Sequence, residues 1–190
     1  CFIKKKINRQ KYKKKGIIKI LNIARFDFQK NHLTLLKAIN NLKIKNKIHL
    51  TLIGYGPEKY KLSEYIEKNK LNDKILNVKK RLSNYYKNSH IFIFPSLYEG
   101  LPTTMVEAAS FGIPIISSNF KSGSKEILLN GKGGYLFKKK NYKSLSSLIN
   151  KFYINPNNFY NKELVCRKNI EKFSKIKNLN LFNDAIKALY

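Results

Sequence analysis

Short apolar runs alternate with longer segments of helical periodicity along the chain from residue 17 onward. Runs of about four to eight apolar residues, rich in isoleucine and bounded by polar turns, are typical of buried strands. The pattern predicts strands at residues 17–24, 48–53, 75–78, 90–94, 113–117 and 135–137. Because these runs are too short for buried helices, we expect them to form the sheet of the domain.

The segments between these strands repeat apolar residues every three or four positions, as Leu33, Leu36 and Ile39 do. This period predicts helices at 32–44, 58–68, 82–88, 103–111, 124–129, 142–153, 157–173 and 178–189. Pro156 separates the sixth of these helices from the seventh. Strands that alternate with helices predict an α/β fold, in which a parallel sheet carries helices on both faces and a helical C-terminal tail follows.

A chain of 190 residues fits one domain with flanking segments. Residues 1–16 are basic and without apolar periodicity, so we interpret them as a solvated linker or a truncated end. The α/β domain is expected to span 17–154, and the C-terminal helices 155–190. Since the chain begins with Cys1 rather than methionine, we expect a fragment or a processed chain.

The formal net charge of +28 favours binding to nucleic acid or to an anionic membrane. However, only four of the 39 basic residues are arginine, and the lysines are spread along the chain among many Asn, Ile, Tyr and Phe residues. This skew is typical of a genome with AT-biased codons rather than of a selected surface. Attraction to an anionic membrane is retained as the second interpretation of the charge.

Cys1 and Cys166 have neither metal-ligand nor redox spacing, and two thiols in 190 residues are typical of a reducing compartment. No apolar run approaches the roughly 20 residues of a membrane span, and the basic N-terminus lacks the apolar core of a secretory signal. We therefore expect a cytoplasmic protein that, if its charge draws it to lipid, lies peripherally at the inner face of the plasma membrane.

The stretch FPSLYEGLPTTMVEAAS, at residues 94–110, leads from a predicted strand through a glycine turn into a helix. The free backbone N–H groups at the start of a helix attract anions. The chain has only 11 acidic residues, yet Glu99 and Glu107 both lie in this stretch. Each has a structural explanation when taken alone, but together they suggest a ligand with a diphosphate between hydroxyl-rich groups.

Ligands of parallel sheets bind at the carboxyl ends of the strands, where the loops at 25–31, 54–57, 79–82, 95–102 and 118–123 should meet. Arg25 and Lys30 are ordinary surface cations if each is taken alone in so basic a chain. Their predicted position beside the two glutamates makes them candidates for binding the anion. The residues brought to this edge are Arg25, Lys30, Glu99, Gly100, Thr103, Glu107 and Gly123.

These motifs resemble the C-terminal, donor-binding domain of retaining glycosyltransferases of the GT-B fold, in family 4, also called glycosyl transferases group 1. YEGLPTTMVEA resembles the family's paired-glutamate motif, and ILNIARFDFQKNHLTLLKAI resembles its strand, Arg, Lys and helix. LIGYGPEKYKL resembles its glycine-rich turn, and SGSKEILLNGKGGYLF resembles its closing segment. The resemblance covers residues 17–140 and implies a Rossmann-like sheet that forms one half of a GT-B fold.

The resemblance implies a role for each matching residue. Arg25 and Lys30 would hold the donor diphosphate, and Glu99 would hold the transferred sugar, so these three form the catalytic set. Glu107 would accept hydrogen bonds from the ribose. The donor-binding residues implied are Gly54, Gly100, Leu101, Pro102, Thr103, Glu107 and Gly123. The substrate implied is a nucleotide-diphosphate sugar, and neither a metal nor another cofactor is expected.

The sequence departs from the family pattern in two places. Residues 78–81 read VKKR, whereas the family commonly has a glycine there near the nucleotide base. Phe120, Lys121 and Ser124 replace the small residues or prolines that are common in the segment before the last predicted strand. We expect neither change to abolish donor binding.

The function implied is the donor-binding half of a retaining glycosyltransferase in bacterial surface-polysaccharide synthesis. It would move a hexosyl or N-acetylhexosaminyl group to a glycan or lipid-linked acceptor. Because residues 1–16 leave no room for an acceptor domain, we expect either a separate N-terminal partner or a truncated product that transfers little alone.

Two alternatives belong to other classes. The first is a basic nucleic-acid-binding domain without enzymatic activity. The twelve Tyr and twelve Phe residues fall mostly at core spacing, so we do not expect a nucleic-acid partner. The second is a phosphorylase-like or epimerase-like domain on the same architecture, against which the Arg–Lys and paired-Glu combination argues.

Overall fold

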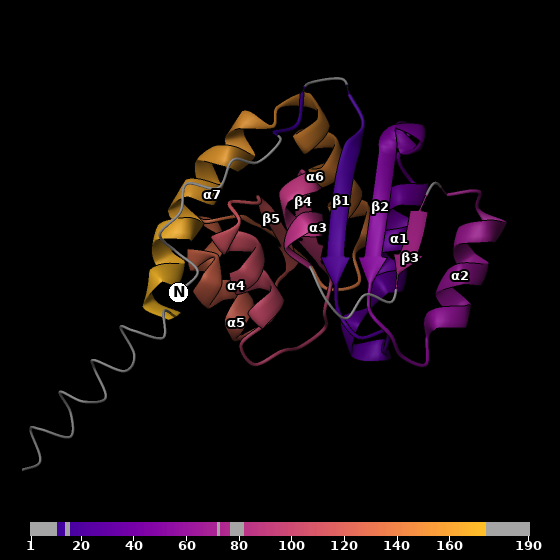
Figure 1. The fold of residues 1–190 in the computed structure, drawn as a ribbon, viewed down its shortest axis with the longest axis horizontal. Helices are drawn as coiled ribbons and strands as arrows, with labels where there is room; N and C mark the ends of the chain where they lie inside the picture. Colours follow the sequence, from indigo (N-terminus) through magenta and orange to yellow (C-terminus); the bar gives the residue numbers. More distant parts are fainter. Residues whose placement is uncertain (1–10, 14–15, 72, 77–81, 174–190) are drawn as a thin grey trace, which may run out of the picture.

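The computed structural model describes residues 11–13, 16–71, 73–76 and 82–173, and at its centre lies a six-stranded parallel sheet. The strands lie in the order β3-β2-β1-β4-β5-β6. Their bounds are β1 Ile18–Ile23, β2 Ile48–Ile53, β3 Asp73–Leu76, β4 Ile91–Phe94, β5 Ile115–Ser118 and β6 Tyr135–Phe137. The chain runs outward from β1 to β3 and then returns to place β4 beside β1, so the strand order reverses between β1 and β4 (Figure 1).

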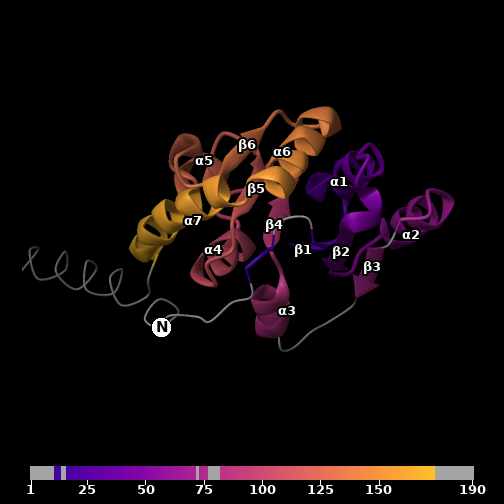
Figure 2. The same cartoon turned by 90° about the horizontal axis from the view of Figure 1, so that it is seen from above.

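Helices cover both faces of this sheet, which confirms the predicted α/β class with a helical C-terminal region. The α-helices are α1 His32–Asn40, α2 Lys59–Lys68, α3 Leu82–Asn88, α4 Thr103–Ser110, α5 Gly123–Ile127, α6 Tyr142–Ile154 and α7 Asn157–Asn169. Short 3-10 helices are η1 Phe28–Lys30, η2 Lys45–Lys47, η3 Leu129–Gly131 and η4 Ile170–Phe173. Figure 2 shows α1 and α6 on one side of β1 and β4, and α3 on the other.

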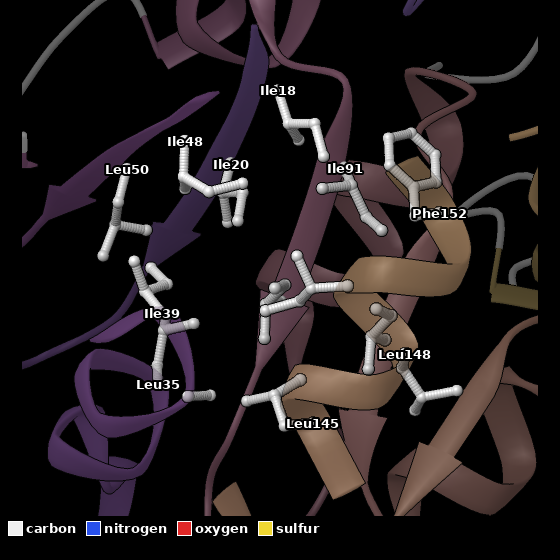
Figure 3. Close-up of a cluster of buried hydrophobic side chains, with 14 of the residues drawn as sticks. Ile18, Ile20, Leu35, Ile39, Ile48, Leu50, Ile91, Leu145, Leu148 and Phe152 are labelled. Carbon is white, nitrogen blue, oxygen red and sulfur yellow. The ribbon is translucent and has the colours of Figure 1, made fainter. Parts of the chain in front are cut away.

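Two apolar cores form because successive side chains of a strand point to opposite faces of a sheet. Ile20 of β1 and Ile91 of β4 lie in a core with α1 and α6, shown in Figure 3. Leu21 and Phe92, which follow them in sequence, lie in a second core with α3 and α4. This burial on both faces explains why the strands appear as continuous apolar runs in the sequence.

The predicted elements are confirmed, with shifts at some of their ends. The third and fifth strands lie two residues from their predicted starts, at Asp73 and Ile115. Helix α1 ends at Asn40, and the N–H of Leu42 then donates to the carbonyl of Ile39 at 3.0 Å in a tighter turn. The predicted helix at 178–189 lies outside the described residues.

At Tyr12 the structure contradicts the prediction of a solvated segment, which covered residues 1–16. Its side chain is buried, and its ring lies 5.4 Å from the ring of Phe152 and 5.6 Å from that of His90. Its backbone N–H donates to the hydroxyl of Tyr160 at 2.8 Å. The basic residues around Tyr12 give no sign of this burial in the sequence. The contacts of Tyr12 join the segment before β1 to α6 and α7.

Candidate functional site

The loops that follow β1 and β4 are joined by hydrogen bonds at the carboxyl edge of the sheet, at the bottom of Figure 1. The N–H of Leu97 donates to the carbonyl of Gln29 at 2.8 Å, and the Gln29 side chain donates to the carbonyl of Tyr98 at 2.7 Å. The Asn31 amide donates to the carbonyl of Pro95 at 3.1 Å. Because the strand order reverses between β1 and β4, this is where a crevice for a ligand opens in such a sheet.

Lys30 and Glu99 meet at this edge, as the predicted convergence of these loops requires. The Nζ atom of Lys30 lies 2.5 Å from Oε1 of Glu99, and the two side chains are only 18% and 12% exposed. Lys30 reaches this position from η1, whose N-terminus is capped by the Asp27 carboxylate. The structure therefore pairs the candidate phosphate cation directly with the candidate sugar carboxylate.

Arg25 lies on the same loop but points more freely into solvent. Its side chain is 62% exposed, and its Nε atom lies 3.8 Å from Oδ2 of Asp27. This exposed pair is weak, so the guanidinium is available to an anion.

Glu107 is held by a residue that the sequence analysis did not single out. Its Oε2 atom accepts a hydrogen bond of 2.7 Å from the hydroxyl of Tyr86 on α3. Burial, together with the neighbouring Glu107 carboxylate, raises the pKa of Tyr86 far above its ordinary value, so the phenol remains a donor. The Tyr85–Tyr86 pair in a predicted helix was the available signal, but such aromatic residues usually indicate packing alone.

The N-terminus of α4 is open between the two glutamates. Pro102 precedes the helix without a side-chain cap. The N–H groups of Met105 and Val106 both donate to the carbonyl of Pro102. Among the described residues, no hydrogen bond occupies the N–H groups of Thr103 and Thr104. Free N–H groups at the start of a helix attract anions.

The residues around this helix start differ in exposure. Gly100, Leu101 and Thr103 are exposed, whereas Pro102 is buried. A Cβ atom added to Gly100 would meet nothing within 4 Å. The fold therefore leaves open space at Gly100, where a ligand could approach the backbone closely.

Gly54 and Gly123 are required by packing between loops. A Cβ atom on Gly54 would lie 1.9 Å from the carbonyl oxygen of Ala24, in the loop that carries Arg25. A Cβ atom on Gly123 would lie 2.3 Å from Cδ of Pro102, and its N–H donates to the carbonyl of Gly100 at 3.1 Å. Both glycines thus support the neighbouring site loops through close backbone contacts. The segment at 78–81, where the sequence departs from the family pattern, lies outside the described residues.

The fold and this edge together define a Rossmann-like domain whose candidate residues lie at the switch point of the sheet. The chain belongs to the glycosyl transferases group 1 family, whose sequence model matches residues 4–173. Solved glycosyltransferase structures share the fold and confirm the predicted GT-B class. The catalytic domain of cholesterol-α-glucosyltransferase from Helicobacter pylori aligns at a TM-score of 0.75 and 24% identity, over 83% of this chain and 99% of that one. HepE from Anabaena, in complex with UDP and glucose, aligns at a TM-score of 0.82 and 15% identity, over 91% and 49% of the two chains.

Curated relatives come from archaea and bacteria. An uncharacterized glycosyltransferase of Methanocaldococcus jannaschii is 37% identical over 111 residues, which are 57% of this chain and 27% of the relative. The amylovoran biosynthesis glycosyltransferase AmsD of Erwinia amylovora is 35% identical over 58% of this chain and 32% of its own length. The chain thus spans about a quarter to a third of the length of these relatives. In the part of the chain that the structure describes, no helix has the length and apolar character that a membrane crossing requires.

Proposed function

We propose that this chain is the donor-binding half of a retaining glycosyltransferase, and that it takes a sugar from a nucleotide-diphosphate donor. The observation that carries this proposal is the arrangement of Lys30, Glu99 and Glu107 around the open N-terminus of α4. Family membership supports the reaction class. The name of the amylovoran relative supports a role in bacterial polysaccharide synthesis.

The diphosphate would bind at the N–H groups of Thr103 and Thr104, because the partial positive charge of a helix start attracts phosphate. Arg25 and Lys30 would add full positive charges beside it. Their charge would stabilise the diphosphate as it leaves the sugar, which is electrostatic catalysis without a metal ion. An ammonium group has three donors, so Lys30 can bind a phosphate oxygen while it still contacts Glu99.

The two glutamates would bind the hydroxyl groups on either side of the diphosphate. Glu99 would accept hydrogen bonds from the transferred hexosyl or N-acetylhexosaminyl group, close to the open space at Gly100. Glu107 would accept from the ribose. Leu101 and Pro102 would lie between the sugar bound at Glu99 and the ribose bound at Glu107.

We also propose that the glycan or lipid-linked acceptor binds to a separate domain, which corresponds to part of the remaining length of the relatives. The chain alone would then bind the donor but transfer sugar slowly. A cytoplasmic location at the inner face of the plasma membrane suits a lipid-linked acceptor. The net charge of +28 would favour that location by attraction to anionic lipids.

Titration of UDP, of GDP and of a single-stranded oligonucleotide into the purified chain tests this proposal. Charge-assisted hydrogen bonds contribute about 1.5–3 kcal/mol, so Glu107→Ala should weaken nucleotide binding roughly tenfold to a hundredfold. Glu126→Ala on α5, whose exposed carboxylate pairs with Lys172, is the matched control and should bind as the wild type does.

Two results would contradict the proposal. One is that neither nucleotide binds to the wild type, and the other is that Glu107→Ala binds as tightly as the wild type. Oligonucleotide binding that weakens steeply with salt, in the absence of nucleotide binding, would favour the nucleic-acid alternative instead.

A further inference from the structure

We propose that Tyr86 is a positioning residue, which aims the Glu107 carboxylate at the ribose and so makes the site selective for ribonucleotides over deoxyribonucleotides. This inference rests on the proposed function, in which Glu107 binds the ribose hydroxyls. Its physical basis is the contact that Tyr86 makes from α3 to Glu107 on α4.

The geometry of this contact leaves the carboxylate little choice of orientation. The Tyr86 hydroxyl lies 2.7 Å from Oε2 of Glu107, which is a strong hydrogen bond to a charged acceptor. Glu107 itself is half-buried, whereas the Tyr86 side chain is only 1% exposed. The bond therefore ties a side chain at the site to a fixed point in the core.

The ring of Tyr86 is itself held by aromatic neighbours. It stacks on Phe111, with ring centroids 5.0 Å apart and planes 12° apart, and its centroid lies 6.1 Å from that of Phe92. Phe111 directly follows α4, so the helix that carries Glu107 also fixes the ring that orients it. A ring packed in this way can present its hydroxyl at one position only.

A phenol is well suited to orient a carboxylate that must still bind hydroxyl groups. It donates one hydrogen bond and carries no charge, so the negative charge of Glu107 remains available at its other oxygen. Burial raises the pKa of Tyr86, so this donor remains protonated at ordinary pH. Glu99 contrasts with this arrangement, because its partner is the Lys30 cation.

Pre-organisation of Glu107 should matter most for a ligand with two neighbouring hydroxyls. A carboxylate that is free to rotate loses conformational entropy when it binds a diol, and that loss weakens binding. A carboxylate already held by Tyr86 avoids most of this loss. A 2′-deoxyribose offers one hydroxyl fewer, so it gains less from the fixed orientation.

The test compares UDP with 2′-deoxy-UDP as titrants in wild type, Tyr86→Phe, Glu107→Gln and the double variant. Wild type should bind UDP about tenfold more tightly than 2′-deoxy-UDP, because UDP makes one more hydrogen bond to a charged group. Tyr86→Phe keeps the ring contacts and removes only the hydroxyl. It should weaken UDP binding roughly threefold to tenfold and 2′-deoxy-UDP binding less, so that the preference shrinks. The double variant should bind UDP no more weakly than Glu107→Gln, because the two residues act as one unit.

Two further variants keep the test decisive. Tyr85→Phe, on the same helix, is the matched control and should retain the full ribose preference. Glu107→Asp leaves α3 untouched but withdraws the carboxylate from the Tyr86 hydroxyl, so it should lose the preference even though a carboxylate is present. If Tyr86→Phe fails to fold, which circular dichroism would reveal, a ribose preference that survives in Glu107→Asp would still overturn the positioning role.

The outcomes separate this inference from the proposed function. If wild type prefers UDP and Glu107→Gln loses that preference while Tyr86→Phe and Glu107→Asp keep it, the positioning role is wrong and the nucleotide site stands. If Tyr86→Phe weakens both ligands equally, Tyr86 only supports the fold and the inference is overturned. If wild type binds neither ligand, the proposed function fails and the inference fails with it.

Discussion

The two glutamates of the site are held by different chemistry at the residue scale. Glu99 forms a short, largely buried ion pair with Lys30, whereas Glu107 accepts a hydrogen bond from the neutral phenol of Tyr86. A diphosphate oxygen would share the Lys30 ammonium group with Glu99, but it would leave the Tyr86 contact unchanged. The sugar end of the proposed site should therefore respond to phosphate binding, and the ribose end should remain fixed.

Lys30→Met should destabilise the fold as well as weaken binding. The substitution leaves the Glu99 carboxylate largely buried without its cation, so the free energy of unfolding should fall by about 1–3 kcal/mol. Urea denaturation measures this change. Lys61→Met removes an exposed ion pair with Glu58 and should cost less than about 1 kcal/mol. Equal losses of unfolding free energy in the two variants would show that the Lys30–Glu99 pair stabilises the fold no more than the Lys61–Glu58 pair does.

His32 should make the stability of the fold depend on pH. Its ring is fully buried, and neither ring nitrogen has a hydrogen-bond partner among the described residues. Burial lowers the pKa of His32 from 6.5 to about 4, a shift that Asp27 opposes and Lys30 reinforces. Between these two pH values the unfolded chain binds the extra proton, so stability falls as the pH falls through this window.

Denaturation of wild type and His32→Leu at a series of pH values measures this dependence. From pH 7 to pH 4, wild type should lose about 3 kcal/mol more than the variant, in keeping with the fall of the His32 pKa from 6.5 to about 4. Parallel pH profiles for the two proteins would contradict a buried, neutral His32.

At the scale of elements, the apolar pattern predicted the strands and helices because both faces of the sheet are buried. It also predicted the meeting of the loops that carry Lys30 and Glu99, since parallel strands end at one edge. It could not predict the ion pair itself, which depends on η1 turning the Lys30 side chain toward β4. Nor could it reveal Tyr86, because spacing in α3 distinguishes a buried face but not a hydroxyl that reaches another helix.

Two glycines at the loop ends have different roles, since Gly54 shapes the fold and Gly100 leaves space for a ligand. Gly54→Ala places a Cβ atom 1.9 Å from the Ala24 carbonyl oxygen, so it should cost about 1–3 kcal/mol of stability.

Gly100→Ala meets open space, so thermal denaturation should show no change, whereas donor-sugar binding should weaken by about tenfold. If Gly100→Ala binds a nucleotide sugar as tightly as wild type, the sugar does not lie beside Gly100.

At the scale of the whole molecule, the candidate residues gather at one edge of the sheet. The sheet reverses order between β1 and β4, and the candidate residues line that edge on loops joined by hydrogen bonds. The chain spans about a quarter to a third of the length of its first curated relatives, and under the proposed function the acceptor would bind to a further domain. Donor binding is accordingly the activity that this chain should show when it is isolated.

A crystal structure of the chain grown with UDP tests donor binding at the α4 edge most directly. The proposal predicts phosphate oxygens within hydrogen-bond distance of the Thr103 and Thr104 N–H groups and of Lys30 Nζ. It also predicts the ribose hydroxyls on Glu107, with the Tyr86 contact intact. UDP bound elsewhere, for example in the groove between β2 and α3 that Thr51 and Tyr85 line, would contradict it.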